Sequence, residues 1–167
     1  MRVALAIVVP LAAALLQGSV VPFIAVGGAR PNLVVLFAAT WAVAAGAREA
    51  VWWAFLGGIA VDLLSGGPLG ATALSALIPM AVIGMLEDQS RPRSILGGAV
   101  LVSLASLAAG LLYLGSLAVA GAAVGDLPLL LATVVSSAVY NGALAIATYP
   151  FFRTLRRSTE KQASFGL

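Results

Sequence analysis

Long apolar runs alternate with short polar breaks along the whole chain. Each break holds a few glycine, proline or charged residues, and the apolar runs themselves are 15 to 30 residues long. Because a bilayer core is about 30 Å thick and a helix needs about 20 apolar residues to cross it, this pattern predicts an all-α, polytopic membrane protein. The predicted six-helix transmembrane domain, residues 1–152, has spans at 3–26, 33–47, 50–64, 71–86, 95–124 and 127–152, and a basic cytoplasmic tail follows at 153–167.

The predicted spans differ in length. The second and third have 15 residues each and would reach only about 22 Å at 1.5 Å per residue, so we expect them to lie behind neighbouring helices, thin the membrane or borrow flanking residues. The fifth, with 30 residues, is too long, and we expect it to tilt or to end between Gly115 and Gly121. The first resembles a signal peptide in outline, but it lacks a clear cleavage site, so we expect it to be retained as a helix.

Charge predicts the orientation. With the N-terminus inside, eight of the nine basic residues fall on the cytoplasmic side, which is a strong positive-inside bias, and both termini are cytoplasmic. Only Arg30 remains outside. The inner residues are Arg2, Arg48, Arg91, Arg93, Arg153, Arg156, Arg157 and Lys161. Rings at Trp52, Trp53, Tyr149, Phe151 and Phe152 are expected at the same inner interface.

Composition narrows the function classes. The chain is 62% hydrophobic and 9% charged, too few charges for the surface of a soluble domain. It has no cysteine and no histidine, which excludes disulfides, thiolate chemistry, histidine bases and the common zinc sites. The basic residues cluster at the ends of apolar runs, so we expect a lipid bilayer and no nucleic acid as partner. We predict no enzyme activity, no cofactor and no metal.

Asp62 is the one carboxylate that the pattern places within the membrane, in an apolar run that breaks at a glycine-proline turn. An ionisable group there is costly and usually functional. At the end of the third span the carboxylate faces the negative end of the helix dipole, so something must offset its charge. The candidates are backbone N–H groups of the Ser65-Gly66-Gly67 turn, or a polar or basic group on a partner protein. A proton or ion relay is a third reading, for which Asp62 lacks a second acid.

Glycines surround this carboxylate. Gly66 and Gly67 would allow positive φ where the helix ends, and Pro68 would block its continuation. Gly57 and Gly58 would let another backbone pack closely one turn before Asp62. The predicted partner-binding or turn-shaping residues are Gly57, Gly58, Asp62, Gly66, Gly67 and Pro68.

Other polar residues within the apolar runs have two readings. Gln17, Ser106, Ser137 and Asn141 are typical of helix–helix association through hydrogen bonds and small residues, and the alternative is that they line a cavity.

Several short motifs resemble the rod shape-determining protein MreD family over nearly the whole chain. They are Leu16-Gln17-Gly18-Ser19 with Pro22-Phe23, Arg30-Pro31-Asn32-Leu33, Arg48-Glu49, Leu56-Gly57-Gly58, Asp62 to Gly70, and Tyr149-Pro150-Phe151-Phe152 before a basic tail. Only Asp62 to Gly70 is specific. The chain departs from the family where Pro31-Asn32 stands for the frequent Pro-Asp, and Ala71-Thr72-Ala73-Leu74 lacks the histidine often found there.

The resemblance implies a non-catalytic scaffold in the bacterial inner membrane, part of the cell-elongation complex that synthesises peptidoglycan. The implied partners are the bitopic MreC-type protein, bound through its transmembrane helix, a RodA-type glycosyltransferase with its class B penicillin-binding protein, and the MreB-type filament. We expect a partner surface rich in small residues on the second, third and fourth spans.

The implied fold is similar to the six-helix substrate-binding subunits of energy-coupling-factor transporters. An alternative function is therefore a small-molecule-binding membrane subunit of a vitamin-type transporter. A cavity open to the outside and lined by Gln17, Asp62 and polar residues of the last span would support it.

Overall fold

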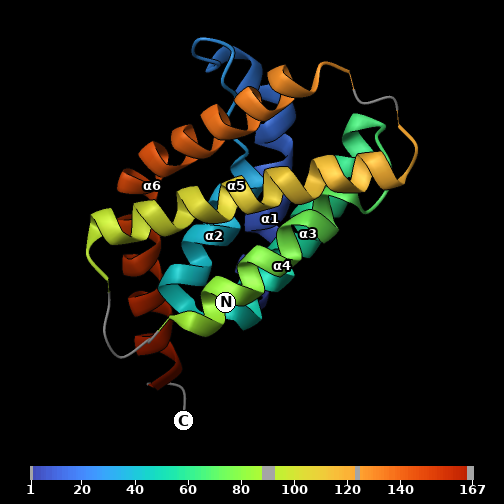
Figure 1. The fold of residues 1–167 in the computed structure, drawn as a ribbon. Coiled ribbons are helices and arrows are strands. Elements are labelled where there is room, and N and C mark those ends of the chain that lie inside the picture. Colours follow the sequence, from blue (N-terminus) through green and yellow to red (C-terminus); the bar gives the residue numbers. More distant parts are fainter. Residues whose placement is uncertain (1, 88–92, 123–124, 165–167) are drawn as a thin grey trace.

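The computed structural model describes residues 2–87, 93–122 and 125–164, and within these ranges it is all-helical, with six α-helices (Figure 1). The predicted all-α class and number of helices are confirmed. Arg91, residues 123–124 of the predicted fifth span and residues 165–167 of the predicted tail lie outside the described ranges. The elements are α1 (Arg2–Ser19), the 3₁₀ turn η1 (Val21–Phe23), α2 (Leu33–Ala45), α3 (Ala47–Ser65), α4 (Ala71–Leu86), α5 (Ile95–Val119) and α6 (Leu127–Ser164).

Helix α2 is the centre of the bundle. Eleven of its 13 residues are buried, and it packs against each of the five other helices. A helix that is apolar all round belongs either in a protein core or in a membrane, and the burial of α2 places it in the core of the bundle. The short helix α2 therefore lies behind the other helices, which is one of the arrangements expected from the sequence.

Two glycines set the closest helix contacts. A Cβ atom added to Gly58 of α3 would lie 2.4 Å from the Cα of Ala73 in α4. One added to Gly84 of α4 would lie 2.3 Å from the backbone nitrogen of Ala47 at the start of α3. Helix α4 is thus held at both of its ends by backbone contacts that no side chain could share.

Two helices end elsewhere than their predicted spans. Helix α1 stops at Ser19 rather than near Val26, because Pro22 disfavours the helical conformation of the residue before it and forms part of η1. Helix α6 continues past Phe152 to Ser164, since residues 151–164 contain neither glycine nor proline. Helix α5 ends at Val119, inside the interval expected for it.

The predicted interface rings are divided between core and surface. The ring of Trp53 stacks on Trp41 with centroids 4.6 Å apart, and Phe152 packs edge-on against both. Tyr149 is also buried, so Trp53, Tyr149 and Phe152 pack within the bundle, and their place at the inner membrane interface stays a prediction. Trp52 and Phe151 are 47% and 64% exposed.

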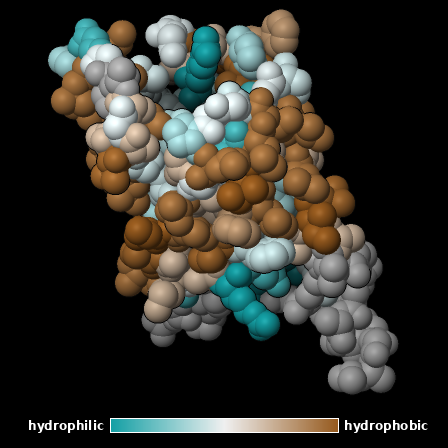
Figure 2. All heavy atoms as spheres, turned by 90° about the vertical axis from the view of Figure 1, so that its right-hand side faces the viewer, coloured by the Kyte–Doolittle hydropathy of each residue, from teal (hydrophilic) through white to brown (hydrophobic). Residues whose placement is uncertain are grey.

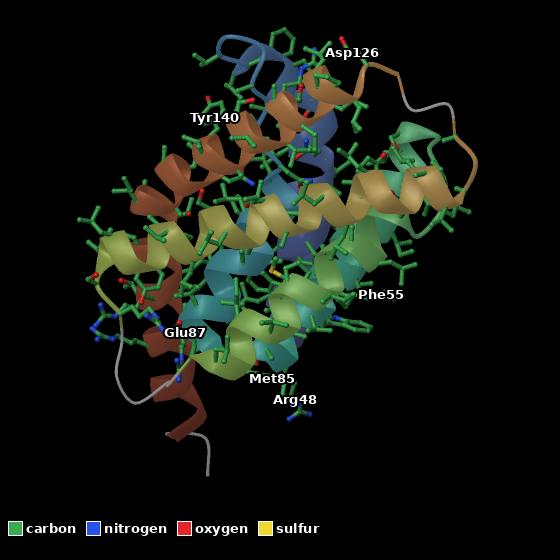
Figure 3. The ribbon with its side chains drawn as sticks, in the orientation of Figure 1. Arg48, Phe55, Met85, Glu87, Asp126 and Tyr140 are labelled. Atoms are coloured by element: carbon green, nitrogen blue, oxygen red, sulfur yellow. The ribbon has the colours of Figure 1, made fainter. Side chains whose placement is uncertain are left out.

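The outer surface is apolar in the middle and polar towards the ends (Figure 2). Large apolar side chains are exposed on every α-helix except α2. Arg48 and Glu87 lie at one end of the bundle, and Asp126 lies at the other with the α3–α4 turn (Figures 1 and 3). We call these the Arg48 end and the Asp126 end. In the described part of the chain, two helical stretches, Ile95–Val119 and Leu127–Thr159, are long and apolar enough to cross a membrane.

Candidate functional site

The Asp62 carboxylate joins α3 to α4. Its Oδ2 accepts a hydrogen bond from the backbone N–H of Gly70 at 2.8 Å, and both oxygens lie 3.2 Å from the backbone nitrogen of Thr72. The residue is 2% exposed. The carboxylate thus supplies the cap that Gly70, the N-cap residue of α4, cannot provide itself. The positive end of the α4 dipole offsets the unfavourable charge at the end of α3.

The hydrogen-bond donors differ from those expected in the turn. They come from Gly70 and Thr72, not from the Ser65-Gly66-Gly67 backbone, and Ser65 only donates through its Oγ to the Asp62 carbonyl at 3.4 Å. Gly66 has φ +68° and ends α3 as expected, whereas Gly67 does not have positive φ. That conformation falls instead on Gly70, at φ +89°. The sequence feature that could have indicated this conformation is the position of Gly70 directly before an apolar run.

The six predicted site residues divide by exposure. Gly57, Gly58 and Asp62 are buried, and a Cβ on Gly57 would lie 2.7 Å from Cγ1 of Val34. Gly66 and Pro68 are exposed and Gly67 is half-buried. A partner at this site would therefore contact the turn itself, while the three buried residues determine how the helices pack beneath the turn.

A second polar cluster holds the entry to α2. The buried Asn141 of α6 accepts from the Asn32 backbone N–H at 3.1 Å, and its Nδ2 donates to the Asn32 carbonyl at 3.1 Å and to Ser106 Oγ of α5 at 2.9 Å. Three elements are thereby fixed to one another by a single amide side chain.

Gln17 of α1 performs the same task from the other side. Its Nε2 donates to the Pro31 carbonyl at 3.2 Å, and its Oε1 accepts from the Leu33 backbone N–H at 2.7 Å. The amides of Gln17 and Asn141 therefore serve helix association, the first of their two predicted readings, and both also line the cavity described next.

A cavity of about 290 Å³ lies near the Asp126 end, and residues of all six helices line it. Eleven of its 16 lining residues are polar, Gln17, Ser137 and Asn141 among them. Exposed Arg30, Ser65 and Thr133 place its opening at the surface. Asp62, which the transporter alternative would place in such a cavity, does not line it, because its carboxylate is turned to the backbone of Gly70 and Thr72.

The Arg48 end has a smaller cavity of about 190 Å³. Trp41 Nε1 donates to Glu49 Oε2 at 2.9 Å at its wall, and Arg156 Nη1 donates to the Ala44 carbonyl. Each of these polar groups serves to hold neighbouring helices together. Among the described residues there is no cluster of three or more acids that could hold a metal ion.

Comparison with known families gives one result that covers nearly the whole chain. A model of the family described as rod shape-determining protein MreD matches residues 1–159. The comparisons with curated proteins and with solved structures give no match, so the similarity to transporter subunits remains a prediction. The chain belongs to the MreD family of membrane proteins, which takes part in determining rod shape.

Proposed function

We propose that this protein is a non-catalytic, multi-pass scaffold of the bacterial inner membrane that binds the transmembrane helix of an MreC-type partner. The family match over residues 1–159 carries the proposal. Through that partner the protein would join a RodA-type glycosyltransferase, its class B penicillin-binding protein and the MreB-type filament. The exposed apolar side chains support a lipid-embedded bundle, since soluble proteins do not expose such a surface.

All six helices would span the membrane, with both termini in the cytoplasm. Supporting this, Arg48 and Arg156 belong to the Arg48 end, whereas Asp126 lies at the opposite end (Figure 3). Cationic residues on one side are the usual sign of the cytoplasmic face. The short helices α2 and α4 lie against longer neighbours, which would cross the part of the membrane thickness that these two helices do not reach.

The partner surface is best placed on α4. Helix α2 is buried and offers no face, and the small residues Gly57, Gly58 and Gly84 pack inside the chain, so the expected small-residue surface is not available there. Helix α4 instead exposes Leu74, Ile78, Val82 and Met85 at spacings of four, four and three, a single helical face. A second apolar helix could pack along that row.

Cross-linking tests the surface. Because the chain has no cysteine, Ile78→Cys introduces a single thiol, which is paired with single cysteines along the transmembrane helix of an MreC-type partner. Val139→Cys on α6 is the matched control, because Val139 and Ile78 are similarly exposed, at 63% and 59%. We expect disulfide formation at position 78 with a helical periodicity along the partner, and none at 139. Equal cross-linking at both, or none at 78, contradicts the proposed surface.

The polar cavity favours one alternative, a small-molecule-binding subunit of a vitamin-type transporter. Function does not follow from fold, and the family match points to rod shape. Partner recovery separates the two. A transporter subunit would co-purify with an ATP-hydrolysing module, whereas the scaffold would co-purify with the MreC-type protein.

A further inference from the structure

The cavity near the Asp126 end is more polar than packing requires. Polar side chains are costly inside a lipid-embedded bundle, yet in this chain, which is 62% hydrophobic, eleven of the 16 residues that line the cavity are polar. Its volume of about 290 Å³ is near the lower limit for ligand pockets.

Several lining groups have hydrogen-bonding capacity that the fold does not use. Thr72 is 7% exposed, its N–H is bonded to Asp62 and its carbonyl to Ser75, yet its hydroxyl has no partner among the described residues. The same is true of the Tyr113 hydroxyl. Thr72 lies on α4, beside the Asp62 cap, and Tyr113 lies on α5. Two elements thus present unused hydroxyl groups to the same space.

Among the described residues that line the cavity, Arg30 is the only charged one. The guanidinium of Arg30 makes no ion pair or hydrogen bond within the described part of the chain, and no carboxylate lines the cavity. Asp62 lies close behind Thr72, but its charge is engaged with the start of α4. One anionic group can therefore be matched by Arg30.

We propose that this cavity binds the phosphate ester of a small polyol, with the phosphate at Arg30 and the polyol hydroxyls at Thr72 and Tyr113. Two sources carry this chemistry. One is a free glycerol phosphate, and the other is the headgroup of phosphatidylglycerol entering from the bilayer.

The two sources are separated by two measurements on the purified full chain. Equilibrium dialysis in detergent measures binding of radiolabelled glycerol 3-phosphate. Native mass spectrometry, after mixing with equal phosphatidylglycerol and phosphatidylcholine, measures which lipid is retained. Binding in the first arm identifies the free ester, and retention of phosphatidylglycerol alone identifies the lipid headgroup.

Three variants locate the site: Arg30→Gln, Thr72→Val and Tyr113→Phe. Each is expected to weaken binding or selective retention about fivefold or more, as loss of one hydrogen bond would. Tyr140→Phe and Thr148→Val are the matched controls, because their hydroxyls bond to backbone carbonyls and lie outside the cavity lining. Neither should change binding.

Melting temperatures of the ligand-free variants show whether each is folded. No binding in either arm, or binding that all three folded variants retain, overturns the proposal. Because partner binding is not measured, failure here leaves the scaffold function unaffected, and the reverse also holds.

Discussion

The carboxylate of Asp62, near the end of α3, accepts a hydrogen bond from the backbone N–H of Thr72, the second residue of α4, with both oxygens 3.2 Å from the nitrogen. One side chain thereby caps a helix eight to ten residues later in the chain and fixes the turn between the two helices. This explains how a buried carboxylate is tolerated in an apolar bundle without a basic partner.

Asp62→Ala should destabilise the protein because it leaves the N–H groups of Gly70 and Thr72 without an acceptor in a buried place. We expect a loss of about 1–3 kcal/mol in the free energy of unfolding, and a smaller loss for Asp62→Asn, which keeps one acceptor oxygen. Thermal unfolding in detergent measures both. Asp126→Ala is the control, since Asp126 caps the exposed start of α6 through a contact of 3.5 Å. If Asp126→Ala costs as much as Asp62→Ala, the special role of the Asp62 cap is refuted.

Gly58→Ala should prevent α3 and α4 from packing, since even a methyl group would lie 2.4 Å from the Ala73 backbone. We expect little folded protein, seen as a low yield of monodisperse material in size-exclusion chromatography.

Gly115→Ala is the matched control in α5. Nothing lies within 4 Å of the added Cβ, so the change should be neutral or stabilise by about 0.5–1 kcal/mol through helix propensity. A well-folded Gly58→Ala protein with unchanged melting temperature would contradict the described contact.

Asn141→Ala should loosen the entry to α2, because three hydrogen bonds to Asn32 and Ser106 are lost at a residue with no exposed surface. We expect about 1–3 kcal/mol of destabilisation by thermal unfolding. Ser136→Ala, whose hydroxyl bonds only to carbonyls of its own helix, should change stability little. Equal melting temperatures for the two variants would show that the Asn141 cluster does not hold the bundle.

Single cysteines test the orientation. Asp126→Cys should react in intact spheroplasts with a thiol reagent that cannot cross the membrane, and Arg48→Cys should react only after lysis, because the two residues lie at opposite ends of the bundle (Figure 3). Reaction of both from the outside, or the reverse order, would contradict cytoplasmic termini and six spans.

The lengths of the apolar runs and the breaks between them were sufficient to predict six helices. The breaks at Arg30-Pro31, Arg48-Glu49 and Ser65 to Gly70 are strong local signals. They did not predict that α6 continues to Ser164, since a polar helical segment and a polar tail have similar composition. The pattern also did not predict which of the aromatic rings are buried. Whether Trp53 faces lipid or stacks on Trp41 depends on contacts with distant elements.

The site was found in sequence through one residue, Asp62, whose charge is conspicuous in an apolar run. Its partners were missed because backbone N–H groups of Gly70 and Thr72 leave no signature in side-chain chemistry. The cavity could not be located either. Its polar wall is assembled from all six helices, and only the packed bundle shows that Thr72 and Tyr113 line the same space.

Purification in mild detergent with mass spectrometry of the co-purifying proteins tests the central claim most directly. The scaffold account predicts recovery of an MreC-type bitopic protein together with a RodA-type glycosyltransferase and its class B penicillin-binding protein. Recovery with an ATP-hydrolysing transport module and without any of these proteins would contradict it.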